Sequence, residues 1–140
     1  MQDYLKYRFI TNDDGTGTLF YYTLDEKNAH IPSVVAGFKM VAVGRWAFFY
    51  RDPYYERTPL EEVEFDEGYR EIYHGAFYGC PKLKKISLPS TVEKMYGNPF
   101  DGCDSLTEIV FPNGNDHFRF EDGKLTDMDG NVYFDRKAGK

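Results

Sequence analysis

A six-residue pattern with apolar residues at its first, fourth and sixth positions occurs three times in this chain, at intervals of 23 residues. The three copies begin at Leu60, Leu83 and Leu106. A repeat of fixed length predicts a solenoid, because each unit buries its apolar side only by stacking on the next unit. No other feature restricts the fold as strongly. The repeat therefore makes the chain a scaffold that displays a surface.

A second motif follows the first with the same period. Phe77 lies in the sequence AFYGC and Phe100 in the sequence PFDGC, 23 residues later. An earlier copy without the Gly-Cys pair ends in Phe48, so these three rings are predicted to form a column inside the stack. Within the six-residue pattern apolar and polar residues alternate, which indicates a short strand with one buried face. We therefore expect a β-rich solenoid of about three coils with short parallel strands.

We predict one domain over residues 1–140, with a β-hairpin capping each end of the stack. Near the C-terminus the hairpin is indicated by Asp129-Gly130, a strong two-residue turn signal. Such caps cover strand edges that would otherwise promote aggregation. The predicted segments are an N-terminal cap over approximately 7–30, repeats over 31–112, a C-terminal cap over 113–134 and a frayed tail over 135–140.

The first coil is longer than the others. From Phe48 to Leu60 there are twelve residues, whereas the equivalent interval in the later coils is six, which predicts a loop inserted over 49–59. Loops inserted in solenoids emerge on one face, often the binding face, and tyrosine and arginine dominate interface hot spots. The alternative is that these rings fold back and cover the flank of the stack. The candidate partner-binding residues of the loop are Tyr50, Arg51, Tyr54, Tyr55 and Arg57.

The polar positions of the strands are expected to point outward and to align in columns. Glu62, Lys85 and Glu108 share one column, and Glu61 and Lys84 share the next. The alternating charges favour cross-strand ion pairs on a solvated face, each contributing about 0.2–1 kcal/mol. The alternative is a charged groove that selects a protein partner. The candidate partner-binding residues on the strands are Glu62, Glu64, Lys85 and Glu108.

Composition narrows the classes of partner. The net charge of -6 disfavours binding to phosphate backbones and anionic lipid, so neither nucleic acid nor membrane insertion is expected. No run approaches the roughly 18 apolar residues that cross a bilayer. Residues 1–8 lack the apolar core of a signal peptide. The chain as written is therefore expected in the cytoplasm, and the alternative is a mature fragment of an exported protein.

The sequence contains few residues in patterns that indicate catalysis, metal binding or a disulfide. Cys80 and Cys103 lie one repeat apart, and two free thiols are favoured over a disulfide because both side chains would point the same way. The three histidines do not share a repeat position. Residues 127–131 weakly resemble a calcium loop but lack its closing glutamate, so a hairpin turn is the better interpretation. We predict no catalytic residue, no metal site and no cofactor.

The repeat resembles the BspA-type leucine-rich repeat of bacterial surface proteins. The residues that carry the resemblance are LKKISLPSTV at 83–92 and AFYGC at 76–80, and the flanks at 31–44 and 122–125 are similar to the entry and exit of that family. The resemblance extends over roughly 7–134. It differs at Pro99, where alanine is usual, at Phe49-Tyr50, which replace Gly-Cys, and in having no visible export signal.

The resemblance implies a curved stack of parallel strands backed by turns and short helical or 3-10 pieces, which makes the expected fold class α/β. It also implies a secreted or cell-surface location, adhesion to or recognition of proteins, and no catalytic residue. Our leading hypothesis is a non-enzymatic protein-binding module. The alternatives are a structural spacer or self-assembly domain of a larger surface protein, and a carbohydrate-binding module that uses exposed tyrosine and tryptophan.

Overall fold

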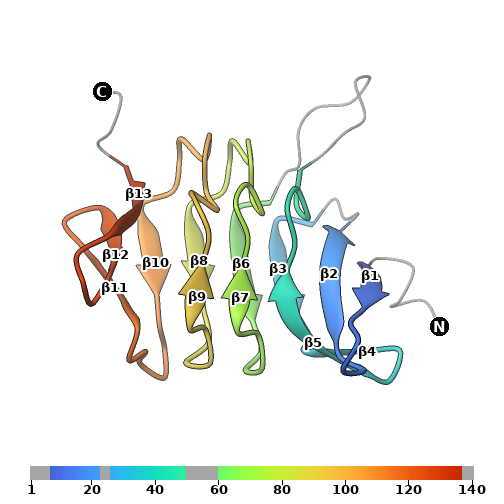
Figure 1. The fold of residues 1–140 in the computed structure, drawn as a ribbon. Coiled ribbons are helices and arrows are strands. Elements are labelled where there is room, and N and C mark those ends of the chain that lie inside the picture. The colour runs from blue at the N-terminus through green and yellow to red at the C-terminus, as the bar shows by residue number, and fades with distance from the viewer. Residues whose placement is uncertain (1–6, 23–25, 50–59, 137–140) are drawn as a thin grey trace.

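The computed structural model describes residues 7–22, 26–49 and 60–136. Most of these residues form two layers of short strands, and from β3 to β9 each pass of the chain contributes a strand to each layer (Figure 1). A third, three-stranded sheet lies at the C-terminal end. Every apolar position of the six-residue pattern that begins at Leu60 is buried, and so is every one in the copy that begins at Leu83. The burial of one face of each strand explains why the period of 23 residues produces a stack.

The six-stranded sheet forms one layer, in the order β1-β2-β5-β7-β9, with β4 paired to β5. Beyond the antiparallel β1–β2 hairpin, β2, β5, β7 and β9 run parallel. Its strands are β1 (Tyr7–Thr11), β2 (Gly17–Tyr22), β4 (Val34–Val35), β5 (Phe38–Val43), β7 (Glu71–Ile72) and β9 (Lys94–Met95).

The four-stranded sheet forms the other layer, in the order β10-β8-β6-β3, and all its strands are parallel. Val63 pairs with Ile86, and Ile86 pairs with Ile109, so the apolar residues of successive coils lie directly beside one another. Its strands are β3 (Asn28–Ile31), β6 (Glu62–Phe65), β8 (Lys85–Ser87) and β10 (Glu108–Val110).

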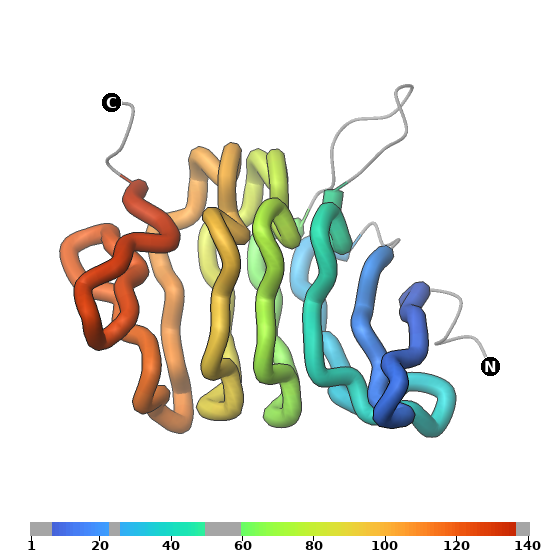
Figure 2. Tube along the Cα trace, viewed as in Figure 1, coloured from blue at the N-terminus to red at the C-terminus, as the bar shows by residue number. Residues whose placement is uncertain are grey.

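A column of phenylalanine rings fills the space between the layers. The ring centroids of Phe48 and Phe77 are 4.5 Å apart, those of Phe77 and Phe100 are 5.3 Å apart, and both pairs are stacked with planes 15° from parallel. Phe77 and Phe100 are fully buried. The tube in Figure 2 shows the regular spacing of the coils that carry these rings. The column predicted from the repeat is therefore present.

The turns after these rings depend on glycine and cysteine. Gly102 has a φ of +80°, and a side chain on it would approach the backbone of Gly79 to 3.2 Å. Cys103 is a free, buried thiol that donates to the carbonyl of Phe77 at 3.0 Å, and the free thiol of Cys80 donates to the carbonyl of Phe48 at 3.5 Å. The contact with the Cys80 thiol and burial together raise the pKa of Cys103, so the thiol stays neutral.

The backbone of these turns differs from the expected short helical or 3-10 pieces. The described residues contain no helix of either kind; single turns stand in their place. Ala76 N–H donates to the carbonyl of Tyr73 at 3.1 Å, and Tyr78 N–H donates to that of Gly75 at 2.9 Å. Other bonds run between coils, as from Phe77 N–H to the carbonyl of Pro99 at 2.8 Å. Bonds to the next coil replace the continuing bonds that would propagate a helix.

Both predicted segment boundaries near the caps require correction. Strand β3 begins at Asn28 and pairs with β6, so residues 28–30 belong to the four-stranded sheet rather than to the N-terminal cap. At the other end Asp135 is part of β13 and pairs with Lys124, so it does not belong to a frayed tail. The C-terminal cap is a three-stranded antiparallel sheet of β11 (Phe118–Glu121), β12 (Lys124–Asp127) and β13 (Val132–Asp135).

Across the described ranges, no helix is long and apolar enough to span a membrane.

Candidate binding surface

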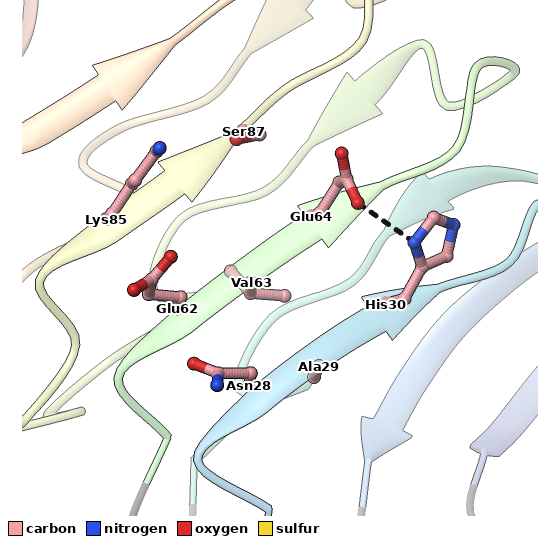
Figure 3. Close-up of a pocket in the computed structure, with 8 residues that line it drawn as sticks. All are labelled: Asn28, Ala29, His30, Glu62, Val63, Glu64, Lys85 and Ser87. Carbon is pink, nitrogen blue, oxygen red and sulfur yellow. Dashed lines mark hydrogen bonds and ion pairs between the residues drawn. The ribbon is translucent and has the colours of Figure 1, made fainter.

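The outer side of the four-stranded sheet carries a hollow of about 300 Å³ (Figure 3). Its floor is formed by the backbone around Ala29 and Val63, whose side chains are buried. The polar side chains around it stand on three neighbouring strands, because alternate residues of a strand point to opposite faces. They are Asn28 and His30 from β3, Glu62 and Glu64 from β6, and Lys85 and Ser87 from β8.

The predicted column of charges is aligned, but its expected ion pairs are missing. Glu62 pairs in register with Lys85, and Lys85 with Glu108. Within the described part of the chain no ion pair joins these three side chains, whereas the neighbouring Glu61 and Lys84 do form one at 3.0 Å. The hydrogen bond and charge of Lys84 lower the pKa of Glu61. Cross-strand ion pairs are expected in both columns, but of these two columns only the one with Glu61 and Lys84 contains such a pair.

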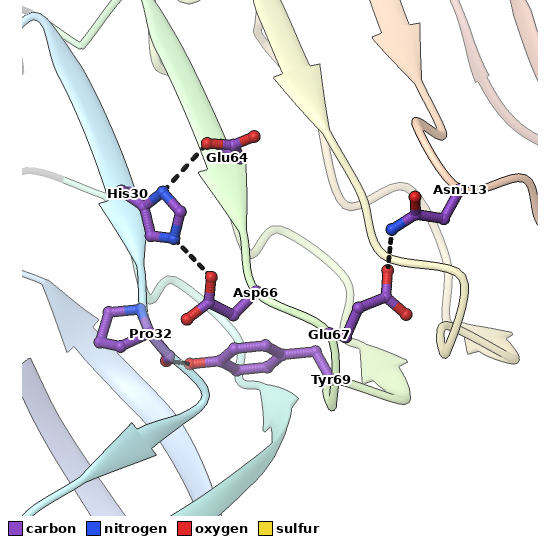
Figure 4. A network of polar contacts seen from close by, with 7 residues as sticks. All are labelled: His30, Pro32, Glu64, Asp66, Glu67, Tyr69 and Asn113. Atoms are coloured by element: carbon purple, nitrogen blue, oxygen red, sulfur yellow. Dashed lines mark hydrogen bonds and ion pairs between the residues drawn. The ribbon is translucent and has the colours of Figure 1, made fainter.

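His30 lies at one side of the hollow between two carboxylates of the neighbouring coil (Figure 4). Its Nδ1 is 3.0 Å from Oε1 of Glu64, and its Nε2 contacts Oδ1 of Asp66. The side chain of His30 is 58% exposed. The hydrogen bond with Asp66, with added attraction from both carboxylates, raises the pKa of His30. A protonated ring can donate to both acceptors at once, which a neutral ring cannot do.

This geometry predicts a pH-dependent contribution to stability. A raised folded-state pKa means that His30 stabilises the fold fully below its ordinary value, and that this contribution is lost as pH rises through the raised pKa. We expect the difference in melting temperature between the unmodified chain and His30→Gln to be largest below the ordinary histidine pKa of about 6.5 and to shrink as pH rises above it. The same His30→Gln change in an Asp66→Asn background should show a weaker pH dependence. A difference that is constant with pH would contradict this assignment.

The turns that follow the four-stranded sheet are tied together by side chains from successive coils (Figure 4). Tyr69 donates its hydroxyl to the carbonyl of Pro32 at 2.7 Å. Glu67 accepts from the backbone N–H of Ser90 at 2.9 Å and from Nδ2 of Asn113 at 3.2 Å. The hydrogen bonds with Ser90, the largest cause, lower the pKa of Glu67. These bonds join the turns that follow all four strands of the sheet, β3, β6, β8 and β10, next to the strand ends.

The structure brings Glu62, Glu64 and Lys85 together around the hollow and places the exposed Glu108 one strand further along the same face. The loop residues Tyr50, Arg51, Tyr54, Tyr55 and Arg57 lie outside the described residues. Trp46, which precedes that loop in the chain, packs edge-on against Tyr78 with ring centroids 4.9 Å apart and remains 36% exposed.

Sequence reasoning missed Asn28, His30 and Ser87. The sequence did contain a signal for Asn28 and His30. Ile31 and Phe65 are partners in the register, so counting back from Ile31 aligns His30 with Glu64 and Asn28 with Glu62. The alternation of apolar and polar residues around Ala29 is weak, because alanine is small and the alternating segment is short. In the described ranges no group of three histidine, cysteine, aspartate or glutamate side chains is placed to hold a metal.

Known proteins resemble the chain in fold and in sequence. A leucine-rich cell surface protein from Faecalibacterium prausnitzii A2-165 is 31% identical, with a TM-score of 0.63 over 74% of this chain and 28% of that one. The T. pallidum leucine-rich repeat protein is 27% identical, with a TM-score of 0.68 over 79% of this chain and 50% of that one. The pneumococcal vaccine antigen PcpA, 18% identical over 79% of this chain and 37% of that one with a TM-score of 0.50, shares the fold alone.

The chain thus spans half or less of the length of each of these structures. A search of curated proteins found no match. A sequence profile of the "BspA type Leucine rich repeat region (6 copies)" matches residues 50–121, slightly more than half of the chain. Together with the parallel strands repeated every 23 residues, this match confirms the resemblance read from the motifs. The chain belongs to the BspA-type leucine-rich repeat family, with a β-rich leucine-rich repeat fold.

Proposed function

We propose that this chain is a non-enzymatic protein-binding module, and that the outer side of its four-stranded sheet contacts the partner. One observation carries the proposal. Glu62, Lys85 and Glu108 are aligned by the backbone on a hollowed face, yet they do not neutralise one another in the described structure. Charged groups that stand on one face and do not neutralise one another favour the approach of a complementary surface.

The charges on this face indicate the chemistry of the partner. The carboxylates of Glu62, Glu64 and Glu108 outnumber the single ammonium group of Lys85, and His30 already contacts Glu64. A partner that presents several basic groups and one acidic group matches this pattern. Because these side chains stand on strands rather than on loops, binding orders the side chains but not the backbone that carries them.

We further propose that the inserted loop adds contacts to the same partner. Tyr54, Tyr55 and Arg57 belong to residue types that supply much of the binding energy in protein interfaces. The loop directly precedes Leu60 in the chain, and the strand that carries Glu62 and Glu64 follows.

Selection from a displayed library of random 12-residue peptides tests this function. We expect the unmodified chain to enrich basic sequences, and the double variant Glu62→Lys/Glu108→Lys to bind them at least about tenfold more weakly, because two attractions become repulsions. The control Asp101→Lys/Glu121→Lys makes the same change in net charge at exposed sites outside the sheet. A loop variant with alanine at Tyr54, Tyr55 and Arg57 tests the loop in the same selection.

Three outcomes would count against the proposal. Enrichment of acidic peptides would reverse the inferred chemistry of the partner. Equal loss of binding in the control double variant would mean that net charge, rather than this face, controls binding. Unchanged affinity in the loop variant would remove the loop from the binding surface while leaving the sheet assignment intact.

A further inference from the structure

The six-stranded sheet ends at β9 with an unpaired edge. Lys94 N–H donates to the carbonyl of Arg70 at 3.1 Å, and Tyr96 N–H donates to that of Ile72 at 3.0 Å, so both bond toward β7. Alternate residues of a parallel strand bond to opposite neighbours. The N–H and C=O of Met95 therefore face the other edge, and no strand in the described part of the chain pairs there. Met95 is only 5% exposed, so these groups are reached through a hollow that Met95 lines.

The side chain of Asn115 caps the last coil next to this edge. Its side-chain Nδ2 donates to the carbonyl of Val92 at 2.9 Å, taking the place of a backbone group in the next coil. Its Oδ1 accepts from the N–H groups of His117 and Phe118 at 2.7 and 2.9 Å. The chain is thereby turned into β11, which pairs with β12 instead of β9.

A hollow of about 280 Å³ lies between the free edge of β9 and the C-terminal sheet. Tyr96 lines it, is 39% exposed and stacks on Tyr73 with ring centroids 4.7 Å apart and planes 15° from parallel. Met128, which is 51% exposed, also lines the hollow, as does Tyr133. The hollow thus combines a strand edge with exposed aromatic and flexible apolar side chains, which suit recognition of peptide side chains.

The charge around this hollow is negative. Glu93, Asp127 and Asp129 contribute three carboxylates, against one ammonium group from Lys94. Asp127 accepts hydrogen bonds from Asn131 and Tyr133, and these, with Asn131 first, lower its pKa. The carboxylate of Asp127 therefore stays ionised to low pH. The hollow favours a cationic occupant.

We propose that this hollow binds an extended, basic peptide segment of a partner protein, which adds as a strand to the free edge of β9. The N–H and C=O of Met95 would bond the peptide backbone, as in other strand-addition complexes. An arginine guanidinium fits the hollow, because it stacks on a tyrosine ring and pairs with carboxylates such as those of Glu93 and Asp129. This surface belongs to the other sheet and goes beyond the proposed function of the hollow beside His30.

A defined probe tests the inference with the full chain. The probe is the fluorescein-labelled peptide Thr-Val-Arg-Val-Arg-Val-Thr-amide, and binding is measured by fluorescence anisotropy. We expect Asp129→Lys and Tyr96→Ala each to weaken binding at least about tenfold. A probe N-methylated at every valine and every arginine, which has blocked amide groups along both of its edges, should bind at least about tenfold more weakly to the unmodified chain. The amide of Met95 should exchange more slowly with solvent in the complex.

Controls separate this site from the four-stranded sheet. The anisotropy measurements are repeated in the Glu62→Lys/Glu108→Lys background, which removes the basic-peptide surface proposed for the four-stranded sheet, and there the probe should still bind and still slow exchange at Met95. Replacing the probe's arginines by glutamates should abolish binding. Equal binding of the N-methylated probe, or unchanged exchange at Met95, would overturn strand addition at β9. Loss of all binding and of the slower exchange at Met95 in the Glu62→Lys/Glu108→Lys background would place the peptide on the other sheet and likewise overturn the inference. The N-methylated probe needs no variant, so the result does not depend on how Tyr96→Ala folds.

Discussion

Replacing Phe77 by alanine is expected to lower the free energy of unfolding by about 3–5 kcal/mol, the largest loss we anticipate from a single change. Phe77 is fully buried and stacks on Phe48 on one side and on Phe100 on the other, so its removal leaves a cavity between these rings. It also contacts Phe65 edge-on, with ring centroids 5.9 Å apart. A domain of this size has a total stability of only about 5–15 kcal/mol, so the variant should be partly unfolded at moderate temperature.

Urea unfolding followed by tyrosine and tryptophan fluorescence and by circular dichroism measures this loss. Phe20→Ala is the matched control, because the same ring is removed from β2 at a position that is 37% exposed. We expect the control to change the free energy of unfolding by less than about 1 kcal/mol. Equal losses in the two variants would show that the column of rings does not stabilise the stack in particular.

Replacing Asn115 by alanine is expected to lower the free energy of unfolding by about 2–3 kcal/mol, the second largest loss. The amide group of Asn115 bonds both sides of the junction between the last coil and the cap. It donates to the carbonyls of Pro89, Ser90 and Val92, and it accepts from two backbone N–H groups at the start of β11. Alanine leaves these groups without their partner, and unsatisfied backbone groups are costly when water does not replace it.

Hydrogen exchange distinguishes this local effect from general destabilisation. In Asn115→Ala we expect faster exchange at Phe118 and in β11, while amides in β6 and β8 keep their protection. Asn113→Ala is the control, because Asn113 lies two residues earlier and its side chain bonds only Glu67 in the described structure. A uniform increase in exchange across the chain would show that Asn115 does not act at the junction.

The regular part of the fold could be predicted because the same physics acts at each repeat. The alternation around Val63 and Ile86 specifies strands with one buried face, and the spacing of Phe77 and Phe100 specifies their shared column. Strand β11 could not be found this way. Its formation depends on Asn115, whose bonds reach carbonyls 23 to 26 residues earlier in the chain, and a local pattern does not reveal such contacts.

The candidate site was predicted only in part, for a related reason. Outward positions such as Glu62 and Lys85 follow from alternation and register. Whether two aligned charges form an ion pair depends on side-chain rotamers, so the sequence could not distinguish the Glu61–Lys84 pair from the unpaired column beside it. His30 was missed because its significance comes from two carboxylates more than thirty residues later.

The buried thiols of Cys80 and Cys103 can be used to detect separation of the coils. Each sulfur is enclosed, and Cys103 is held in its protonated form, whereas alkylating reagents attack the thiolate. Modification therefore requires the coil around the sulfur to separate from the one before it. Cys80 and Cys103 lie in consecutive coils. The relative rates at which the two thiols are alkylated would show whether the coils separate first at the C-terminal end of the solenoid or all together.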